Sequence, residues 1–223
     1  MKRIRPGIPG FDKMIGGGIP EGYSLVVKGV PGSGKTIFSI QYLIEGLKNN
    51  EVCFYISLEE TKKKLEMLSK SFNWNIQKYL DDNLFIEYLH MKDPGEIYAG
   101  IKDMITSFDT KRLVIDNYSY IKCAHPDIRS YTSDLSAELE SAGVTSLLIT
   151  EHLNPAIEKM RFNCIDFICD GVIVLDFKMC NGIGKHYIYV EKMRSCAVDK
   201  TLRPIVFTED GMRIETSASL TDA

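Results

Sequence analysis

Residues 29–36 read GVPGSGKT, which fits the phosphate-binding pattern G-x-x-x-x-G-K-[ST] without a mismatch. Its glycines let the backbone turn so that successive N–H groups point toward phosphate oxygens. Lys35 supplies a cation for the terminal phosphates, and Thr36 offers a hydroxyl to Mg²⁺. This segment, the P-loop, therefore predicts binding of a nucleoside triphosphate with Mg²⁺. The residues expected to contact it are Gly29, Val30, Pro31, Gly32, Ser33, Gly34, Lys35, Thr36 and Ile37.

Two adjacent carboxylates, Glu59 and Glu60, follow the apolar run of residues 52–57, which predicts a buried strand. Acidic side chains are favourable in the first turn of a helix, and residues 62–72 predict a helix directly after the pair. Hydrolysis of a nucleotide also requires a group that orients or deprotonates the attacking water. If this strand neighbours the P-loop strand, one of the two carboxylates reaches the γ-phosphate. Both interpretations, helix start and general base, stay open at this point.

A third acidic residue, Asp116, ends the predicted strand RLVID. An aspartate at a strand end is more often a turn residue than a metal ligand. In a parallel sheet that also carries a P-loop, however, such a carboxylate is the usual partner of the P-loop hydroxyl at the metal. We therefore predict that Thr36 and Asp116 hold Mg²⁺ between them.

A parallel sheet is needed to bring these strand ends together, and the pattern of the chain predicts one. Apolar runs alternate with longer amphipathic stretches over the first two thirds of the sequence. Strands are predicted at 23–29, 52–57, 84–89, 112–116 and 144–150, and helices at 36–47, 62–72, 94–108 and 131–142. This alternation indicates an α/β fold with a mostly parallel central sheet flanked by helices.

Beyond residue 170 the segments GVIVLDF, KHYIYVEKM, RPIVFT and GMRIE are strand-like and closely spaced. The dipeptides Asn181-Gly182 and Asp210-Gly211 between them are typical of hairpin turns. We expect C-terminal antiparallel hairpins that extend the parallel sheet.

The composition narrows the class of protein. A chain of 223 residues, 44% of them hydrophobic, is long enough for one sizeable core, so residues 1–223 are predicted to form a single domain. We expect its N-terminal segment to cover about 1–20 and a frayed tail to cover about 216–223. The net charge of −3 argues against a general nucleic-acid coat. Neither a membrane-spanning stretch nor a signal peptide is recognisable, which predicts a cytoplasmic protein without membrane insertion.

Six cysteines are present, and none forms a C-x-x-C pair. Their spacing and the four scattered histidines fit a zinc site poorly, and we expect reduced thiols.

In their order, the motifs resemble those of KaiC-like ATPases of the RecA superfamily. The likeness is carried by GIPGFDKMIGGGIPEGYSLVVKGVPGSGKT, YISLEET…SFNWNI, RLVID, CDGVIVLD and KMRS…DKTLRP, and it runs from about Gly7 to Pro204. The resemblance implies a RecA-like P-loop NTPase fold that binds ATP with Mg²⁺ and hydrolyses it slowly. It also implies a homo-oligomeric ring, commonly a hexamer, with nucleotides between subunits.

Carried over by position, the resemblance makes Lys35 and Thr36 the P-loop pair and Asp116 the acid on the metal side. It makes Glu59 the general base, assisted by Glu60.

Later positions carry over as well. In the family, the Lys and Arg of the K-M-R motif reach the nucleotide of a neighbouring subunit, and here they are Lys192 and Arg194. Thr150 and Glu151 occupy the position of a phosphate-sensing polar group, although a plain strand end explains them equally well.

The chain also departs from the family pattern. Ser195 stands where a glycine is usual, Cys196 replaces a hydroxyl residue and Val198 replaces a histidine, which puts base preference in doubt. Asn117 and Tyr118 follow the metal-side acid where a serine is common. A second RecA core, as in the circadian-clock KaiC, is absent from these 223 residues, so neither clock function nor autophosphorylation is inferred.

Three classes of function compete. The first is an ATPase whose hydrolysis switches the shape of an oligomer or its choice of an unidentified protein partner. The second is a nucleotide-dependent assembly module with little turnover, exemplified by the archaellum accessory protein FlaH. The third is a RadA-like DNA-binding recombinase, which is disfavoured because two candidate loops contribute only Lys122 with Arg129 and Lys159 with Arg161.

Overall fold

The computed structural model describes residues 2–89, 92–151, 163–180 and 182–216. The strands are β1 Arg3–Ile4, β2 Ile19–Pro20, β3 Ser24–Gly29, β4 Val52–Ser57, β5 Leu84–Tyr88, β6 Thr110–Asp116, β7 Thr145–Glu151, β8 Gly171–Cys180, β9 Ile183–Met193, β10 Arg203–Thr208 and β11 Gly211–Ile214. The helices are α1 Phe11–Met14, α2 Lys35–Lys48, α3 Lys62–Lys70, the 3-10 helix η1 Ile76–Tyr79, α4 Pro94–Ser107, α5 Tyr118–Ala124, α6 Ile128–Ser141 and α7 Cys164–Ile168.

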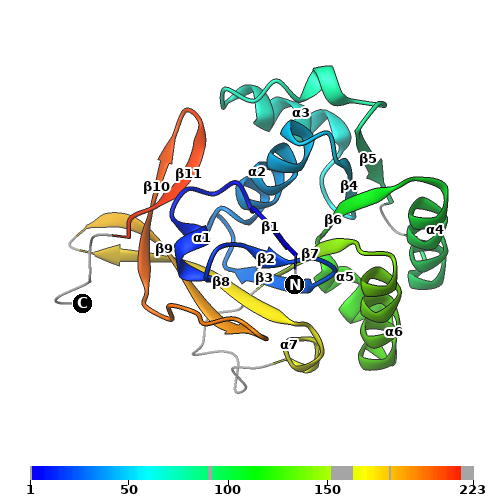
Figure 1. The fold of residues 1–223 in the computed structure, drawn as a ribbon. Coiled ribbons are helices and arrows are strands. Elements are labelled where there is room, and N and C mark those ends of the chain that lie inside the picture. The colour runs from blue at the N-terminus through cyan, green and yellow to red at the C-terminus, as the bar shows by residue number, and fades with distance from the viewer. Residues whose placement is uncertain (1, 90–91, 152–162, 181, 217–223) are drawn as a thin grey trace.

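Nine of the strands form one sheet in the order β11-β10-β9-β8-β3-β7-β6-β4-β5 (Figure 1). The P-loop strand β3 lies at its centre and pairs in parallel with β7 and β8. Strands β6, β4 and β5 continue the parallel half, whereas β9, β10 and β11 extend the sheet from β8 in antiparallel fashion. The prediction of a mostly parallel sheet with antiparallel C-terminal hairpins is therefore confirmed.

The predicted helices are all present, with shifted ends. The helix predicted at 131–142 begins earlier, at Ile128, because the carboxylate of Asp127 accepts the N–H of Ser130 at 3.0 Å and caps the first turn. The helix predicted at 62–72 ends at Lys70. The short elements α1, α5, α7, β1 and β2 were not predicted, since each is too short to show a hydrophobic period.

Helices cover both faces of the sheet (Figure 1). One apolar cluster joins the sheet to α1, α2, α3 and η1, and a second joins it to α4, α5, α6 and α7. Side chains from the N-terminal segment, including Ile8, Phe11 and Ile15, are fully buried in the first cluster. The segment expected over about 1–20 thus belongs to the core.

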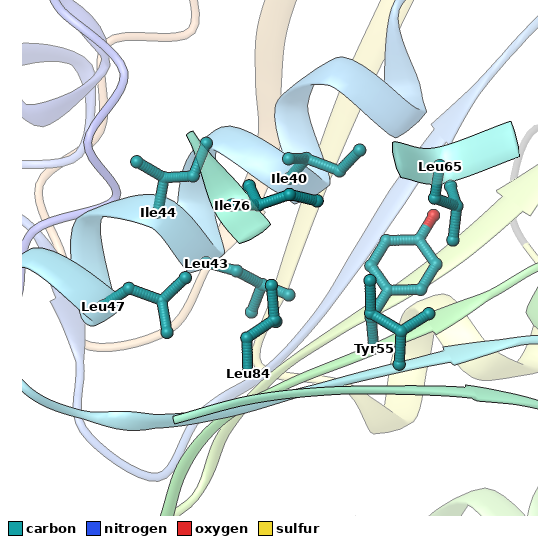
Figure 2. Close-up of a pocket in the computed structure, with 9 residues that line it drawn as sticks. Ile40, Leu43, Ile44, Leu47, Tyr55, Leu65, Ile76 and Leu84 are labelled. Carbon is teal, nitrogen blue, oxygen red and sulfur yellow. The ribbon is translucent and has the colours of Figure 1, made fainter. Parts of the chain in front are cut away.

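Helix α2, which carries the P-loop at its N-terminus, is fixed to the sheet by apolar contacts (Figure 2). Leu43, Leu47, Tyr55, Leu65 and Leu84 enclose a cavity of about 10 Å³ with four isoleucines. A space of that size holds one water at most, and its wall is aliphatic apart from Tyr55. The cavity is a packing gap in the core rather than a ligand site.

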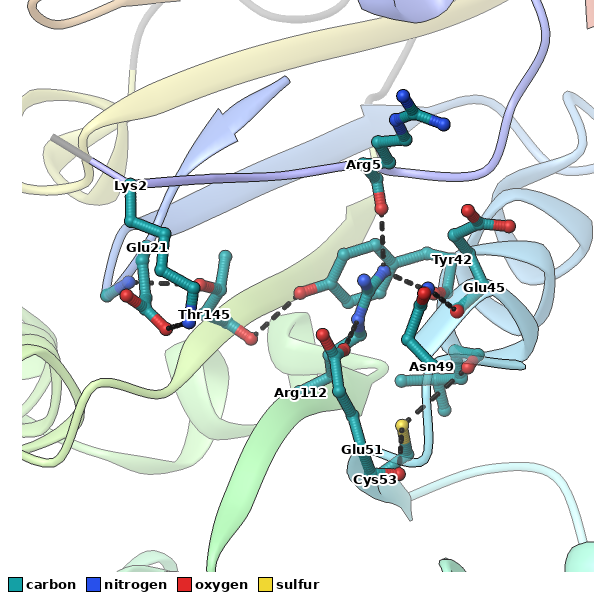
Figure 3. Close-up of polar contacts among 12 residues, drawn as sticks. Lys2, Arg5, Glu21, Tyr42, Glu45, Asn49, Glu51, Cys53, Arg112 and Thr145 are labelled. Atoms are coloured by element: carbon teal, nitrogen blue, oxygen red, sulfur yellow. Dashed lines mark hydrogen bonds and ion pairs between the residues drawn. The ribbon is translucent and has the colours of Figure 1, made fainter. Parts of the chain in front are cut away.

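The opposite end of α2 is tied down by a buried arginine (Figure 3). The Arg112 side chain is 1% exposed and pairs with Glu51. It also donates to the backbone carbonyls of Arg5 at 2.9 Å and Tyr42 at 2.8 Å, and it stacks on the Tyr42 ring at 4.7 Å. A Cβ at Gly46 would come within 2.6 Å of the arginine Nε, so this helix position has room for glycine alone. One cation therefore links β6, α2 and the N-terminal segment.

The predicted turns and tail are described only in part. The turn at Asp210-Gly211 joins β10 to β11, with Gly211 at a φ of 113°. Asn181 of the other predicted turn and residues 217–223 of the predicted tail lie outside the described residues.

Candidate nucleotide site

The P-loop connects the end of β3 to the start of α2, the position that its pattern predicts. Gly32 and Gly34 have φ values of 78° and 98°, a region that other residues enter only with strain. Lys35 Nζ donates to the carbonyl of Gly29 at 2.8 Å and to that of Val30 at 3.1 Å. These carbonyls hold the ammonium group folded over the loop.

A buried hydroxyl in the loop lacks a partner. Ser33 Oγ is fully buried and has no hydrogen-bond partner among the described residues, although its backbone N–H donates to Val30 O at 3.1 Å. A buried polar atom without a partner is costly, and such atoms in native proteins call for an explanation such as an ion or ligand.

The predicted metal-side residues come together. Thr36 Oγ1 donates to Asp116 Oδ2 at 3.4 Å, across the interval between α2 and β6. The same carboxylate oxygen accepts a short hydrogen bond from the hydroxyl of Tyr55. A hydroxyl and a carboxylate are hard oxygen donors of the kind that Mg²⁺ prefers, so the residues present fit this ion. Within the described ranges, no three His, Cys, Asp or Glu side chains are grouped so as to hold a metal by themselves.

Glu59 and Glu60 lie in different environments. The Glu59 carboxylate accepts a hydrogen bond from Asn117 Nδ2 at 3.3 Å. Glu60 pairs with Lys64 at 3.0 Å, and its backbone N–H donates to Ser57 Oγ at 3.0 Å. Glu60 is therefore engaged in the start of α3, whereas Glu59 is held beside the end of β6.

The premise that β4 neighbours the P-loop strand is wrong, because β7 and β6 lie between β3 and β4. Glu59 nevertheless belongs to the same cluster of charges as the P-loop. Parallel strands end at the same edge of a sheet, so side chains that follow β4, β6 and β7 converge there even without direct pairing of β3 and β4.

Burial and mutual charge shift the pKa values at this edge. Burial raises the pKa of Glu59, and the negative charges of Glu151 and Asp116 raise it further. Burial also raises the pKa of Asp116, although the hydrogen bond from Tyr55 and the charge of Lys35 oppose that shift. Burial lowers the pKa of Lys35, against the pull of these same carboxylates. The carboxylates of Glu59, Asp116 and Glu151 thus lie close to the ammonium group of Lys35 at this edge of the sheet.

Thr150 and Glu151 end β7 at this edge as well. Thr150 is buried, whereas Glu151 is exposed and its N–H donates to Ser119 Oγ at 2.9 Å. The charge of Glu151 acts on both Glu59 and Lys35, which places it next to the cluster.

Lys192 and Arg194 lie at the edge of the sheet where β3 and β8 begin, opposite the edge that carries the P-loop. Lys192 is opposite Val172 in the β8–β9 ladder, near the start of β8, whereas the P-loop begins beside Leu175 of that strand. Three residues of a strand span about 10 Å. The two cations are therefore separated from the P-loop of their own chain.

The C-terminal end of α7 holds both cations. Lys192 Nζ donates to the carbonyls of Asp166, Phe167 and Cys169 at 2.9, 3.2 and 2.6 Å. Arg194 donates to Phe167 O at 2.8 Å and pairs with Asp170 at 3.2 Å. Burial lowers the pKa of Lys192, and the nearby guanidinium lowers it further.

Comparison with known proteins places these features in a family. The sequence model described as "ATPase: KaiC" matches residues 4–219. The chain belongs to the KaiC ATPase family.

Its relatives include UPF0273 proteins and circadian clock proteins. The chain is 28% identical to a UPF0273 protein of Methanopyrus kandleri, over 96% of this chain and 92% of that protein. It is 29% identical to the circadian clock oscillator protein KaiC of Acaryochloris marina, over 95% of this chain but 44% of that longer protein. A KaiC-like protein from Pyrococcus horikoshii has a similar structure, with a TM-score of 0.85, 30% identity and coverage of 96% and 99%. The resemblance read from the motifs is confirmed.

The late loop that departs from the KaiC pattern is folded onto its own chain. Ser195, at the usual glycine position, has a φ of 53°, the left-handed conformation that glycine adopts most easily. Cys196 and Val198 pack against the core, and Arg3 Nη1 lies 3.2 Å from the Cys196 sulfur.

The first candidate DNA-binding segment of this KaiC family member is helical rather than a loop. Lys122 lies in α5 and donates to Asn163 Oδ1 at 3.0 Å, and Arg129 lies in α6. Lys159 and Arg161 of the second segment lie outside the described residues. No helix in the described part of the chain has the length and apolarity needed to cross a membrane.

Sequence reasoning missed two residues at the site. Tyr55 reads as an ordinary core residue of β4, and nothing in the sequence shows that its hydroxyl reaches Asp116. Asn117 was noted only as a departure from the family pattern. It caps α5 by accepting the N–H of Ser119 at 2.9 Å while its amide holds Glu59, and an Asn before a helical run was the available signal.

Proposed function

We propose that this chain is a Mg²⁺-dependent ATPase that assembles into a ring and acts as a nucleotide-controlled switch. Membership of the KaiC ATPase family supports the ATP-binding part of this proposal. The observation that carries Mg²⁺-dependent hydrolysis is the convergence of Lys35, Thr36, Asp116 and Glu59 at one edge of the sheet. These are the groups that phosphoryl transfer to water requires.

Each residue has a distinct role in the proposal. Lys35 leaves its carbonyl partners and binds the terminal phosphates. Thr36 and Asp116 would hold Mg²⁺, and the ion would neutralise phosphate charge. Glu59 orients and deprotonates the attacking water, because its oxygen is held beside the metal-side acid by Asn117. A raised pKa suits this role, since a general base works best when its pKa approaches the operating pH. Glu60 assists only indirectly, because Lys64 and the helix start already engage it.

The site is completed by a second copy of the chain in this proposal. Lys192 and Arg194 lie at the edge of the sheet away from their own P-loop, so they serve the nucleotide of a neighbouring subunit. An arginine suits this role because its planar guanidinium offers several donors to the γ-phosphate oxygens. The proposed partners are therefore ATP or ADP, further copies of the chain and a protein that responds to the switch.

The test compares two adjacent glutamates. Glu59→Gln should retain Mg-ATP binding and lower turnover at least about a hundredfold, the scale expected on loss of a general base. Glu60→Gln is the matched control and should lower turnover by less than about threefold, as expected for an exposed ion pair. Lys35→Ala should weaken Mg-ATP binding itself, which isothermal titration calorimetry measures.

The outcomes separate the competing functions. If the wild-type protein binds Mg-ATP but does not hydrolyse it, the chain is a nucleotide-dependent assembly module and not an enzyme. If Glu60→Gln were the more damaging variant, the general base would be shifted by one residue. Salt-dependent DNA binding by the wild type would support the hypothesis of a DNA-binding recombinase.

A further inference from the structure

One histidine of the antiparallel half of the sheet forms a hydrogen bond with the P-loop. His186 lies in β9, and its Nε2 is 3.1 Å from the carbonyl oxygen of Gly32. A carbonyl oxygen only accepts hydrogen bonds, so this contact requires that Nε2 carry the hydrogen. The contact joins residues 154 positions apart in the chain and is separate from the convergence of acids described above.

Aromatic neighbours hold the histidine ring in place. Phe177 lies directly across from His186 in the β8–β9 ladder, with ring centroids 4.9 Å apart. The ring of Phe207 in β10 meets the histidine edge-to-face, also at 4.9 Å. Phe207 packs against the P-loop too, because a Cβ at Gly34 would come within 2.8 Å of its ring. The hairpins therefore contact the loop at two points, Gly32 and Gly34.

The histidine contact fixes the orientation of one peptide group. The Gly32 carbonyl and the Ser33 N–H belong to the same planar peptide and point in opposite directions. His186 holds the carbonyl at 3.1 Å, and Val30 O holds the N–H at 3.1 Å. Rotation of this peptide would break both bonds, so together they hold the curvature of the loop.

We propose that His186 is a positioning residue of the P-loop, which orders the loop for the phosphates of the nucleotide. The inference rests on the proposed function, because it assumes that this loop binds Mg-ATP. Preorganisation of a loop improves affinity by reducing the ordering cost of binding. His186 contacts the loop backbone and touches no reacting atom, so its loss should raise KM and leave kcat nearly unchanged.

Three variants test this role. His186→Phe keeps an aromatic ring between Phe177 and Phe207 but removes the donor, and it should weaken Mg-ATP binding about five- to tenfold, the scale of one neutral hydrogen bond. His186→Gln restores a donor and should recover affinity to within about twofold. His125→Phe is the matched control, because that ring also packs on an aromatic residue, Tyr131 at 5.0 Å, while its Nδ1 accepts the N–H of Asp127 at 3.2 Å rather than contacting the P-loop.

The measurements are titration calorimetry with Mg-ATP, steady-state turnover and two-bond ¹H–¹⁵N NMR of the histidine rings. The last should show the Nε2–H tautomer for His186 in the nucleotide-free wild type at a pH where the ring is neutral. The inference is overturned if His186→Phe binds as the wild type does, if His186→Gln is as weak as His186→Phe, or if the Nδ1–H tautomer is found. A wild type that binds no Mg-ATP would refute the proposed function instead. In that case the tautomer of His186 would still show whether the hydrogen bond to Gly32 forms.

Discussion

A mixture of two inactive variants tests whether the active site is shared between subunits. Arg194→Ala keeps Glu59 and removes the cation proposed to serve the neighbouring subunit, whereas Glu59→Gln keeps that cation and removes the proposed general base. Arg194 is half exposed and its partners are Phe167 O and the Asp170 carboxylate, so its removal should cost little stability. Both variants should therefore fold and assemble.

The expected recovery follows from the placement of β9. In the proposed ring each site would take Glu59 from one subunit and Arg194 from the next, because Arg194 follows β9 at the edge away from its own P-loop. In a randomly mixed ring with equal amounts of both variants, about a quarter of the interfaces would pair an intact Glu59 with an intact Arg194. Loss of an arginine that stabilises the transferring phosphate costs on the order of a thousandfold, so each variant alone contributes a negligible background.

The assay is ATP turnover per subunit after co-refolding or subunit exchange, with co-assembly proved by pulling down one tagged variant. Arg129→Ala, an exposed arginine of α6, is the matched control and should keep full activity without mixing. No recovery despite proven co-assembly would refute a shared site. Full turnover by a strictly monomeric wild type would refute it as well.

Three further predictions follow from single contacts. Arg112→Ala should lower the free energy of unfolding by about 3 kcal/mol in urea titrations, because Glu51 and two carbonyls lose a buried donor; an unchanged midpoint would contradict the assigned link. Asp116→Asn should raise the thermal midpoint of the nucleotide-free protein, because a carboxyl whose pKa is raised by burial destabilises the fold once it ionises. The same variant should lose the added stabilisation by Mg-ATP, and differential scanning fluorimetry measures both effects. Finally, kcat/KM should fall as the pH drops through the raised pKa of Glu59, above the ordinary 4.5, since a base must be deprotonated; a flat pH profile would exclude that role.

Much of the fold was predictable because its signals are local. The P-loop pattern follows a short strand with an apolar centre and precedes a helix with its apolar side chains on one face, and each of these features is visible within a short window. Asp93 before Pro94 marks the start of α4, and its side chain does accept the N–H of Gly95 at 2.8 Å. Predictions from such local signals hold because the tertiary packing favours the same local structure.

The order of strands was not predictable in the same way. Sequence order alone leaves open which strands neighbour β3, and the assumption that β4 does was wrong because β7 and β6 intervene. The contacts of Tyr55 with Asp116 and of His186 with Gly32 depend on that order, since each joins segments far apart in the chain. A histidine in an alternating strand reads as a surface residue until the strand is placed beside the P-loop.

The candidate site gathers several partly buried charges at one place, which is itself an argument for function. Two other buried cations of the described residues are paired: Arg112 with Glu51, and Lys28 with Asp166 and Glu191. At the edge that carries the P-loop, three carboxylates face one lysine, and burial shifts the pKa of Glu59, Asp116 and Lys35 toward their neutral forms. At neutral pH this arrangement costs stability, because raised acid pKa values mean that ionisation opposes folding. A divalent cation at Thr36 and Asp116 would remove that cost, so the stability of this edge should depend on occupancy, and a switch requires that dependence.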